Sequence, residues 1–203
     1  MLKMHKLLNK SQVKVILEIF KNPGINLREI ITNTKLSPNF VSDYVNDLIK
    51  REMLTEEKLE KKRVYLRRFF LNFDSTTTQH FFKLIKEEEK ESFFEKYPKL
   101  KSVFNQLKRE LESEFILVYG SYARMHATKE SDIDVLIVGN FKNKEKIREI
   151  FVSLDIDVSL KVESLKDFEK KKNDALHQQI LKEAVVIFDG GRYFEEMFSG
   201  GKR

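Results

Sequence analysis

The chain has 203 residues, of which 41% are hydrophobic and 34% charged, a composition typical of a folded globular protein rather than a disordered one. It contains no cysteine, which excludes disulfides and thiolate metal sites and agrees with a reducing compartment, so we expect a cytoplasmic protein. The sequence has no apolar run of about eighteen residues and no signal-peptide core in residues 1–10, so we expect no membrane partner.

The positive charge lies in the first third of the chain. Residues 1–75 hold 15 Lys and Arg against 9 Asp and Glu, so they carry the whole net charge of +6, and residues 76–203 are neutral. A basic segment joined to a neutral one favours a polyanionic partner such as DNA, although a solvated basic surface would have the same composition.

The N-terminal segment is predicted to contain three helices and two strands. The helices are expected at 11–20, from Asn26 onward, and from Pro38 to about Glu52. Ser37 is the expected N-cap of the third helix, with Pro38 in its first position. The strands are expected at 53–57 and 63–71, joined by the charged residues 58–62.

This order of elements resembles a winged helix-turn-helix domain over about residues 8–73. The resemblance implies that the third helix, which begins LSPNFVSDYVNDL, is the recognition helix and that residues 58–63 form the wing. The implied DNA-binding residues are Asn39, Ser42, Asn46, Lys61, Lys62 and Arg63. Asp43 and Asp47 on the same helix would repel phosphates. The alternative is a dimerisation or docking module, which leaves a homodimer open.

Residues 76–113 are predicted to be a helical linker that is broken near Pro98. Its Phe pairs at 81–82 and 93–94 are interpreted as core packing. The predicted division is a winged helix-turn-helix domain at 1–75, this linker, and a third part at 114–203.

Strands and helices alternate from Phe115 onward, as in an α/β or an α+β domain, and together with the N-terminal elements we expect an α+β protein. Strands are expected at 115–119, 132–138, 154–162 and 184–188, and helices at 120–127, 144–153, 164–171 and 174–183. The last dozen residues carry no clear signal. His177 is interpreted as a surface or interdomain residue.

The segment YGSYARMHATKESDIDVLIV contains residues suited to binding a phosphate group and a metal ion. Gly120 follows a strand and allows a sharp turn, and Ser121 opens a helix whose free N–H groups favour an anion such as a triphosphate. Asp132 and Asp134 are two apart in a strand, so their carboxylates share one face and repel each other unless a cation lies between them. Such hard oxygen ligands suit Mg²⁺.

This segment resembles the signature of the nucleotidyltransferase superfamily that includes DNA polymerase β, especially its minimal members, over about residues 112–190. The resemblance implies a transferase that uses two Mg²⁺ ions and moves a nucleoside monophosphate, AMP first among them, from NTP to an acceptor. Gly120, Ser121 and Arg124 are the implied nucleotide-binding residues, although Arg124 could instead pair with Glu130 or Asp132. Minimal members often carry glycine where this chain has Met125.

The same resemblance implies a third carboxylate on a neighbouring strand. Asp155 and Asp157 in LDIDVSLKV are the candidates, and periodicity does not choose between them because both share one strand face. The apolar residues around Asp157 pack best as a central strand, which favours Asp157. The implied catalytic and metal-binding set is Asp132, Asp134 and Asp157.

The short catalytic segment leaves no room for a large domain that holds nucleic acid, so the resemblance implies a protein or small-molecule acceptor. Some minimal members are antitoxins that transfer AMP to a partner toxin, and the winged helix favours such an antitoxin-like regulator. The alternative is a non-catalytic winged-helix regulator whose nucleotidyltransferase domain senses NTP or holds a partner.

Overall fold

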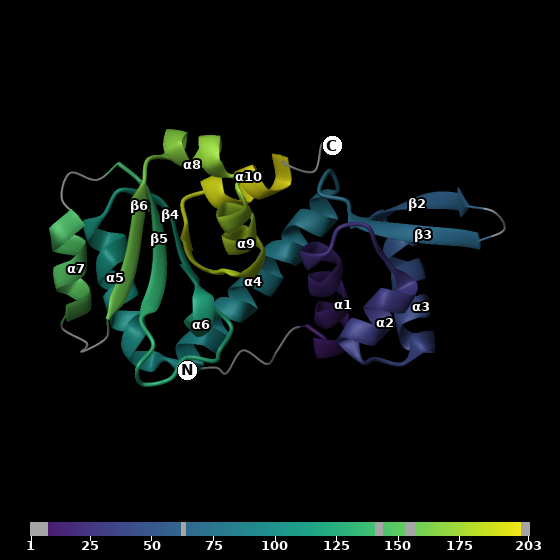
Figure 1. Ribbon diagram of the computed structural model, residues 1–203, viewed down its shortest axis with the longest axis horizontal. Helices are drawn as coiled ribbons and strands as arrows, with labels where there is room; N and C mark the ends of the chain where they lie inside the picture. The colour runs from purple at the N-terminus through teal and green to yellow at the C-terminus, as the bar shows by residue number, and fades with distance from the viewer. Residues whose placement is uncertain (1–7, 62–63, 141–143, 153–156, 200–203) are drawn as a thin grey trace. The chain divides into compact units, whose positions relative to one another are not determined.

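The structure is a computed structural model that describes residues 8–61, 64–140, 144–152 and 157–199 (Figure 1). The chain forms two compact bodies. The first comprises the residues up to Ile85 together with those from Phe198 onward, and the second comprises Lys86–Met197. The division predicted from the sequence, with a linker at 76–113, stays a prediction; these residues form α4 (Thr76–Lys96) and α5 (Pro98–Glu110).

In the described residues up to Leu71, the first body has three helices and a small antiparallel sheet. Its elements are α1 (Lys10–Lys21), β1 (Ile25–Asn26), α2 (Leu27–Thr34), α3 (Pro38–Lys50), β2 (Leu54–Lys61) and β3 (Val64–Leu71), and the strand order is β1-β3-β2. The three helices and the hairpin agree with the sequence prediction. The strand β1 was not predicted, because two residues are too few to show an alternating pattern.

Local side-chain bonds explain where two of these helices begin. At the start of α2, Asn26 Oδ1 accepts a bond of 3.0 Å from the Glu29 N–H, and the Glu29 carboxylate accepts one of 2.9 Å from the Asn26 N–H. At the start of α3, Ser37 Oγ accepts from the Phe40 N–H, and Pro38 occupies the first turn. The predicted cap at Ser37 is therefore confirmed, and Asn26 caps the helix that was expected to begin there.

The hairpin is longer than the sequence predicts. Residues 58–61 belong to β2 and are not a loop, because they pair with β3 from Lys58 opposite Arg67 to Lys61 opposite Val64. The charged side chains of these residues are more typical of a loop, so the sequence did not predict a strand here. The strand is stabilised by its backbone hydrogen bonds with β3. The face of the hairpin that carries Leu54 and Phe69 packs on the helices of the first body, where Phe69 is fully buried.

The second body is built on a mixed four-stranded sheet of order β6-β5-β4-β7. Its remaining elements are β4 (Ser113–Tyr119), α6 (Gly120–Ala123), β5 (Ile133–Gly139), α7 (Lys144–Val152), β6 (Val158–Glu163), α8 (Leu165–Lys171), α9 (Ala175–Glu183), β7 (Val185–Asp189) and α10 (Arg192–Ser199). The strand β5 is parallel to β6, and β4 is antiparallel to both of its neighbours. The fold class is thus α+β, as predicted.

Helices cover both faces of this sheet (Figure 1). On one face, Val135 and Ile137 share a buried cluster with Phe104 of α5 and Phe151 of α7. On the other face, Phe115 packs edge-on against Phe168 of α8 and Tyr193 of α10, with ring centroids 5.0 and 5.8 Å apart. Because both faces of β4 and β5 are buried along the middle of these strands, polar side chains are tolerated there mainly at the strand ends.

The helix α10 is absent from the sequence prediction, and it places Tyr193 fully inside the second body. The phenol of Tyr193 donates to the Leu181 carbonyl at 3.3 Å. Tertiary burial of this aromatic residue stabilises a helix that is only 8 residues long.

The third predicted strand begins at Val158, and its expected start at 154–156 lies outside the described residues. Over the ranges the structure describes, no helix has both the length and the hydropathy to cross a membrane.

Candidate functional site

The turn at Gly120 lies directly beside the Asp134 carboxylate. Gly120 follows β4, opens α6, and has a φ of +69°, which is in the left-handed region. A Cβ atom added there would lie 2.0 Å from Asp134 Oδ2 and 3.0 Å from Asp134 Cγ. Only glycine therefore fits this backbone while leaving the Asp134 carboxylate in place. The turn and the second aspartate of the DID segment are brought into direct contact.

The two aspartates of that segment lie at the start of β5. Asp134 is half-buried and is the register partner of Tyr119, while Asp132 is exposed and comes directly before the strand. Ile133 between them is fully buried on the opposite face. Because side chains alternate along a strand, the two carboxylates lie on one face, as the sequence predicts.

The register of β6 places Asp157 beside this pair. Val158 is opposite Ile133 and Ser159 is opposite Asp134, and the Ile133 N–H donates to the Asp157 carbonyl at 2.8 Å. Asp132 and Asp157 directly precede Ile133 and Val158, so they are opposite each other. They therefore belong to the same sheet face as Asp134. Asp155, the alternative third carboxylate, lies outside the described residues.

The donor chemistry of this cluster fits a hard divalent cation. The available ligands are carboxylate oxygens on neighbouring strands, and the described residues nearby offer no thiolate. As the side chains are placed, no group of three acidic or imidazole residues in the described segments is close enough to hold an ion. The two Mg²⁺ ions expected from the sequence remain a prediction.

Arg124, which follows α6, forms an ion pair that was not predicted from the sequence. Its Nη1 donates to Glu183 Oε2 at 3.0 Å, at the end of α9, rather than pairing with Glu130 or Asp132. Both side chains remain partly exposed, so solvent weakens this ion pair. The pair uses one nitrogen of the guanidinium and leaves donors for an anion at the turn.

Met125 occupies the place where the minimal members often carry glycine. Its φ is +61°, so the chain adopts there the left-handed conformation that glycine accepts most easily. Lys96 Nζ donates to the Met125 carbonyl, and the Met125 side chain packs against the core of the second body. These contacts offset the strain, and the exit from α6 is retained without glycine.

Burial and the neighbouring acids affect Tyr119, the last residue of β4. Desolvation raises the pKa of the Tyr119 phenol, and the negative charges of Asp134 and Glu163 raise it further. The phenol therefore stays protonated at neutral pH, and it can donate a hydrogen bond but cannot act as a base.

An ionic cluster around the buried Glu163 lies farther along β6 and was not predicted from the sequence. Glu163 Oε2 lies 3.0 Å from His177 Nε2, and the ammonium groups of Lys161 and Lys171 lie 3.4 and 3.3 Å from Oε1. Burial acts to raise the pKa of Glu163, but hydrogen bonds with His177 and Lys171 outweigh it, so the pKa is lower than usual. The expectation that His177 is a surface or interdomain residue is wrong, because it is 2% exposed within the second body.

The predicted DNA-binding residues on α3 lie on its outer side. Asn39 and Asn46 are exposed and Ser42 is half-buried. Asp47 Oδ2 lies 2.9 Å from Arg51 Nε, so an adjacent cation reduces its repulsion of phosphate. Asp43 is exposed. Of the predicted wing residues, Lys62, Arg63 and the side chain of Lys61 lie outside the described residues.

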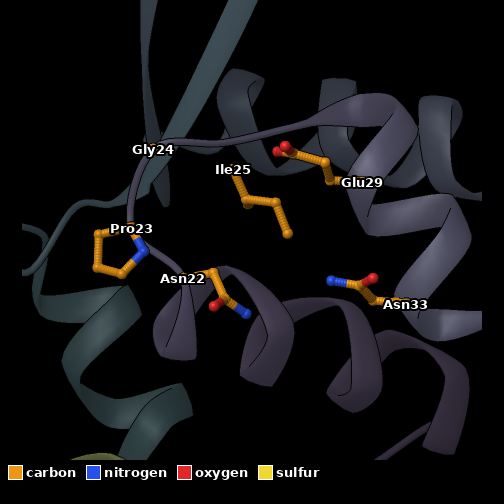
Figure 2. A pocket seen from close by; sticks show the side chains of 6 residues that line it. All are labelled: Asn22, Pro23, Gly24, Ile25, Glu29 and Asn33. Atoms are coloured by element: carbon orange, nitrogen blue, oxygen red, sulfur yellow. The ribbon is translucent and has the colours of Figure 1, made fainter.

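A surface pocket of about 420 Å³ lies elsewhere, in the first body (Figure 2). It is lined by Asn22, Pro23, Gly24, Ile25, Glu29 and Asn33. The amides of Asn22 and Asn33 both donate to Glu18 Oε1, at 2.8 and 2.7 Å, so these polar groups satisfy one another. None of the lining residues belongs to the Gly-Ser turn or to the aspartate cluster.

Comparison with known proteins identifies the family of the second body. A family model described as polymerase β nucleotidyltransferase matches residues 99–192. A Methanocaldococcus jannaschii protein named "Putative protein adenylyltransferase" is 34% identical over 94 residues, which cover 44% of this chain and 94% of that protein. The chain belongs to the polymerase β-type nucleotidyltransferase family. It is therefore a nucleotidyltransferase, as the sequence analysis predicted.

Two further likenesses concern this nucleotidyltransferase. A family model described as winged helix-turn-helix DNA-binding matches residues 8–55, so the enzyme carries a winged helix-turn-helix region in its first body. A solved structure of a "putative nucleotidyltransferase" from Sulfolobus solfataricus aligns with a TM-score of 0.30 and 19% identity, over 53% of this chain and 89% of that one.

Proposed function

We propose that this nucleotidyltransferase transfers a nucleoside monophosphate, AMP in particular, from NTP to a protein acceptor in a Mg²⁺-dependent reaction. The observation that carries the proposal is the contact at Gly120, where a Cβ would lie 2.0 Å from Asp134 Oδ2. A phosphate-binding turn and a metal-binding carboxylate need this proximity, because a nucleotide has to touch both at once.

The roles of the residues follow from their places. Gly120 and Ser121 offer backbone N–H groups at the start of α6 for the β- and γ-phosphates. Arg124, which follows α6, would supply cationic donors to the phosphates. Asp132 and Asp134 would hold Mg²⁺, which when bound neutralises the triphosphate and favours ionisation of the acceptor hydroxyl.

The transfer step exchanges one P–O bond for another. The acceptor oxygen forms a bond to the α-phosphorus, and the bond from that phosphorus to the bridging oxygen of the pyrophosphate breaks, with its electron pair leaving on pyrophosphate. The acceptor loses its proton to Asp157, which stands beside Asp132 in the strand register.

The choice of acceptor rests on the similarity to the named protein adenylyltransferase at 34% identity. A small-molecule acceptor is the alternative. The winged helix supports an antitoxin-like regulator that modifies a partner toxin and binds DNA through α3 and the β2–β3 hairpin.

Isotope transfer tests the proposal. The full chain is incubated with Mg²⁺, each NTP labelled at the α- or the γ-phosphate, and an extract of the source cells. We expect label from the α-phosphate of ATP, and none from the γ-phosphate, on a protein band. Transfer of γ-label, or nucleotide binding without any transfer, would overturn the proposal, and the second outcome would favour a non-catalytic regulator.

A further inference from the structure

The amide of Asn46 is held by the β2–β3 hairpin. Asn46 is exposed on α3, and its Oδ1 lies 3.3 Å from both Nη1 and Nη2 of Arg67, which belongs to β3. Arg67 Nε donates to Glu56 Oε2 on β2 at 2.6 Å, and the guanidinium lies 5.2 Å from the Phe69 ring centroid. The recognition helix and both strands of the hairpin therefore meet at one guanidinium.

The chemistry of the guanidinium fixes which end of the amide faces it. Arginine carries only donors, so the Asn46 atom that faces Arg67 has to be the oxygen and not the nitrogen. Both contacts come from one guanidinium, whose two Nη groups approach this oxygen from the same side and direct it toward Arg67. Hydrogen bonding by Arg67 lowers the pKa of Glu56, so Glu56 is a carboxylate at neutral pH and keeps Arg67 in place. Asn46 therefore presents Nδ2, a donor, to its surroundings.

We propose that Asn46 is a specificity-determining residue that reads a guanine, and that Arg67 is the positioning residue that sets this preference. The inference rests on the proposed DNA binding through α3. Asparagine usually reads adenine by accepting from N6 and donating to N7, which requires a free amide oxygen. With its oxygen directed toward Arg67, Asn46 meets a base through its Nδ2 donor. Guanine offers two acceptors in the major groove, N7 and O6. Adenine has one acceptor, N7, beside an amino donor, thymine has one, O4, beside a methyl group, and cytosine has only an amino donor.

Asn39 provides a matched comparison on the same helix. It is exposed, and none of the side-chain hydrogen bonds among the described residues involves its amide. Asn39 can therefore present either its donor or its acceptor to a base. The constraint proposed for Asn46 arises from the Arg67 contact and is not a property of asparagine on this helix.

Selection from a randomised duplex library with the full chain at fixed salt tests the inference. We expect one position with guanine preferred over adenine by about fivefold to a hundredfold, and loss of that preference in Asn46→Ala. In Arg67→Met the amide oxygen is released, and the same position should shift toward adenine. Asn39→Ala should leave this position unchanged.

The outcomes separate this inference from the proposed function. If the wild-type chain binds no duplex at low salt, DNA binding itself fails and the inference fails with it. If the chain binds DNA but the Asn46-dependent position prefers adenine, or keeps guanine in Arg67→Met, the inference alone is overturned. Asn46→Asp, which keeps the shape of the residue and the bond to Arg67 but removes the donors, should also lose the guanine preference if Arg67→Met is poorly folded.

Discussion

The tight contact at Gly120 predicts a specific defect for Gly120→Ala. The backbone has a φ of +69°, which costs a residue with a Cβ about 1–2 kcal/mol of stability. The new Cβ would also lie 2.0 Å from Asp134 Oδ2, about 1 Å closer than such atoms normally approach, so the carboxylate has to move. Because Asp134 is a proposed Mg²⁺ ligand, its displacement should weaken the affinity for Mg²⁺ by roughly 10- to 100-fold.

Gly191 provides the control because it also has a positive φ, +110°, but among the described residues no atom beyond its chain neighbours lies within 4 Å of the site where its Cβ would be. Gly191→Ala should therefore lose stability through backbone strain alone. The affinity for Mg²⁺·ATP is measured by isothermal titration calorimetry, and the stability of each variant by chemical denaturation. We expect Gly120→Ala to raise the Kd at least tenfold and Gly191→Ala to leave it unchanged. Equal Kd values for the two variants would refute the placement of the nucleotide at this turn.

Three further predictions concern the carboxylates. Mg²⁺·NTP should raise the melting temperature of the wild-type chain, and Asp132→Asn combined with Asp134→Asn should abolish the rise while the fold is retained, as circular dichroism would show. Asp157→Asn should stop transfer but leave nucleotide binding largely intact in the same thermal assay, whereas Asp155→Asn should reduce transfer less. A larger loss of transfer in Asp155→Asn than in Asp157→Asn would assign the third carboxylate to Asp155. The lowered pKa of Glu163 contributes stability that is present above the ordinary glutamate pKa and is lost as the pH falls through the folded-state value. Glu163→Gln should therefore unfold at a lower denaturant concentration than the wild type at pH 7, and its stability should fall less than that of the wild type when the pH is lowered. An unchanged denaturation midpoint at pH 7 would contradict the stabilising role of Glu163.

Local signals made the first body and the motif predictable. Asn26 and Ser37 are caps whose side chains bond within three residues, so their effect can be read from the sequence alone. The two-residue spacing of Asp132 and Asp134 determines their common face in the same local way.

Features that depend on distant partners were not predictable. Glu183 is 59 residues from Arg124, and no local pattern indicates their ion pair. The burial of His177 depends on Glu163, on a strand that a helix separates from α9. The helix α10 likewise depends on burial of Tyr193 against Phe115, and only the tertiary fold brings these rings together.

The central claim is that the Gly120 turn and the aspartate cluster form a centre for nucleotidyl transfer. The most direct measurement compares, in one reaction, the nucleoside monophosphate that becomes attached to the acceptor with the pyrophosphate that is released. The wild-type chain should give equal amounts of both in Mg²⁺, and the Asp132→Asn, Asp134→Asn double variant should give neither. Release of orthophosphate without attachment, or undiminished transfer by the double variant, would contradict the claim.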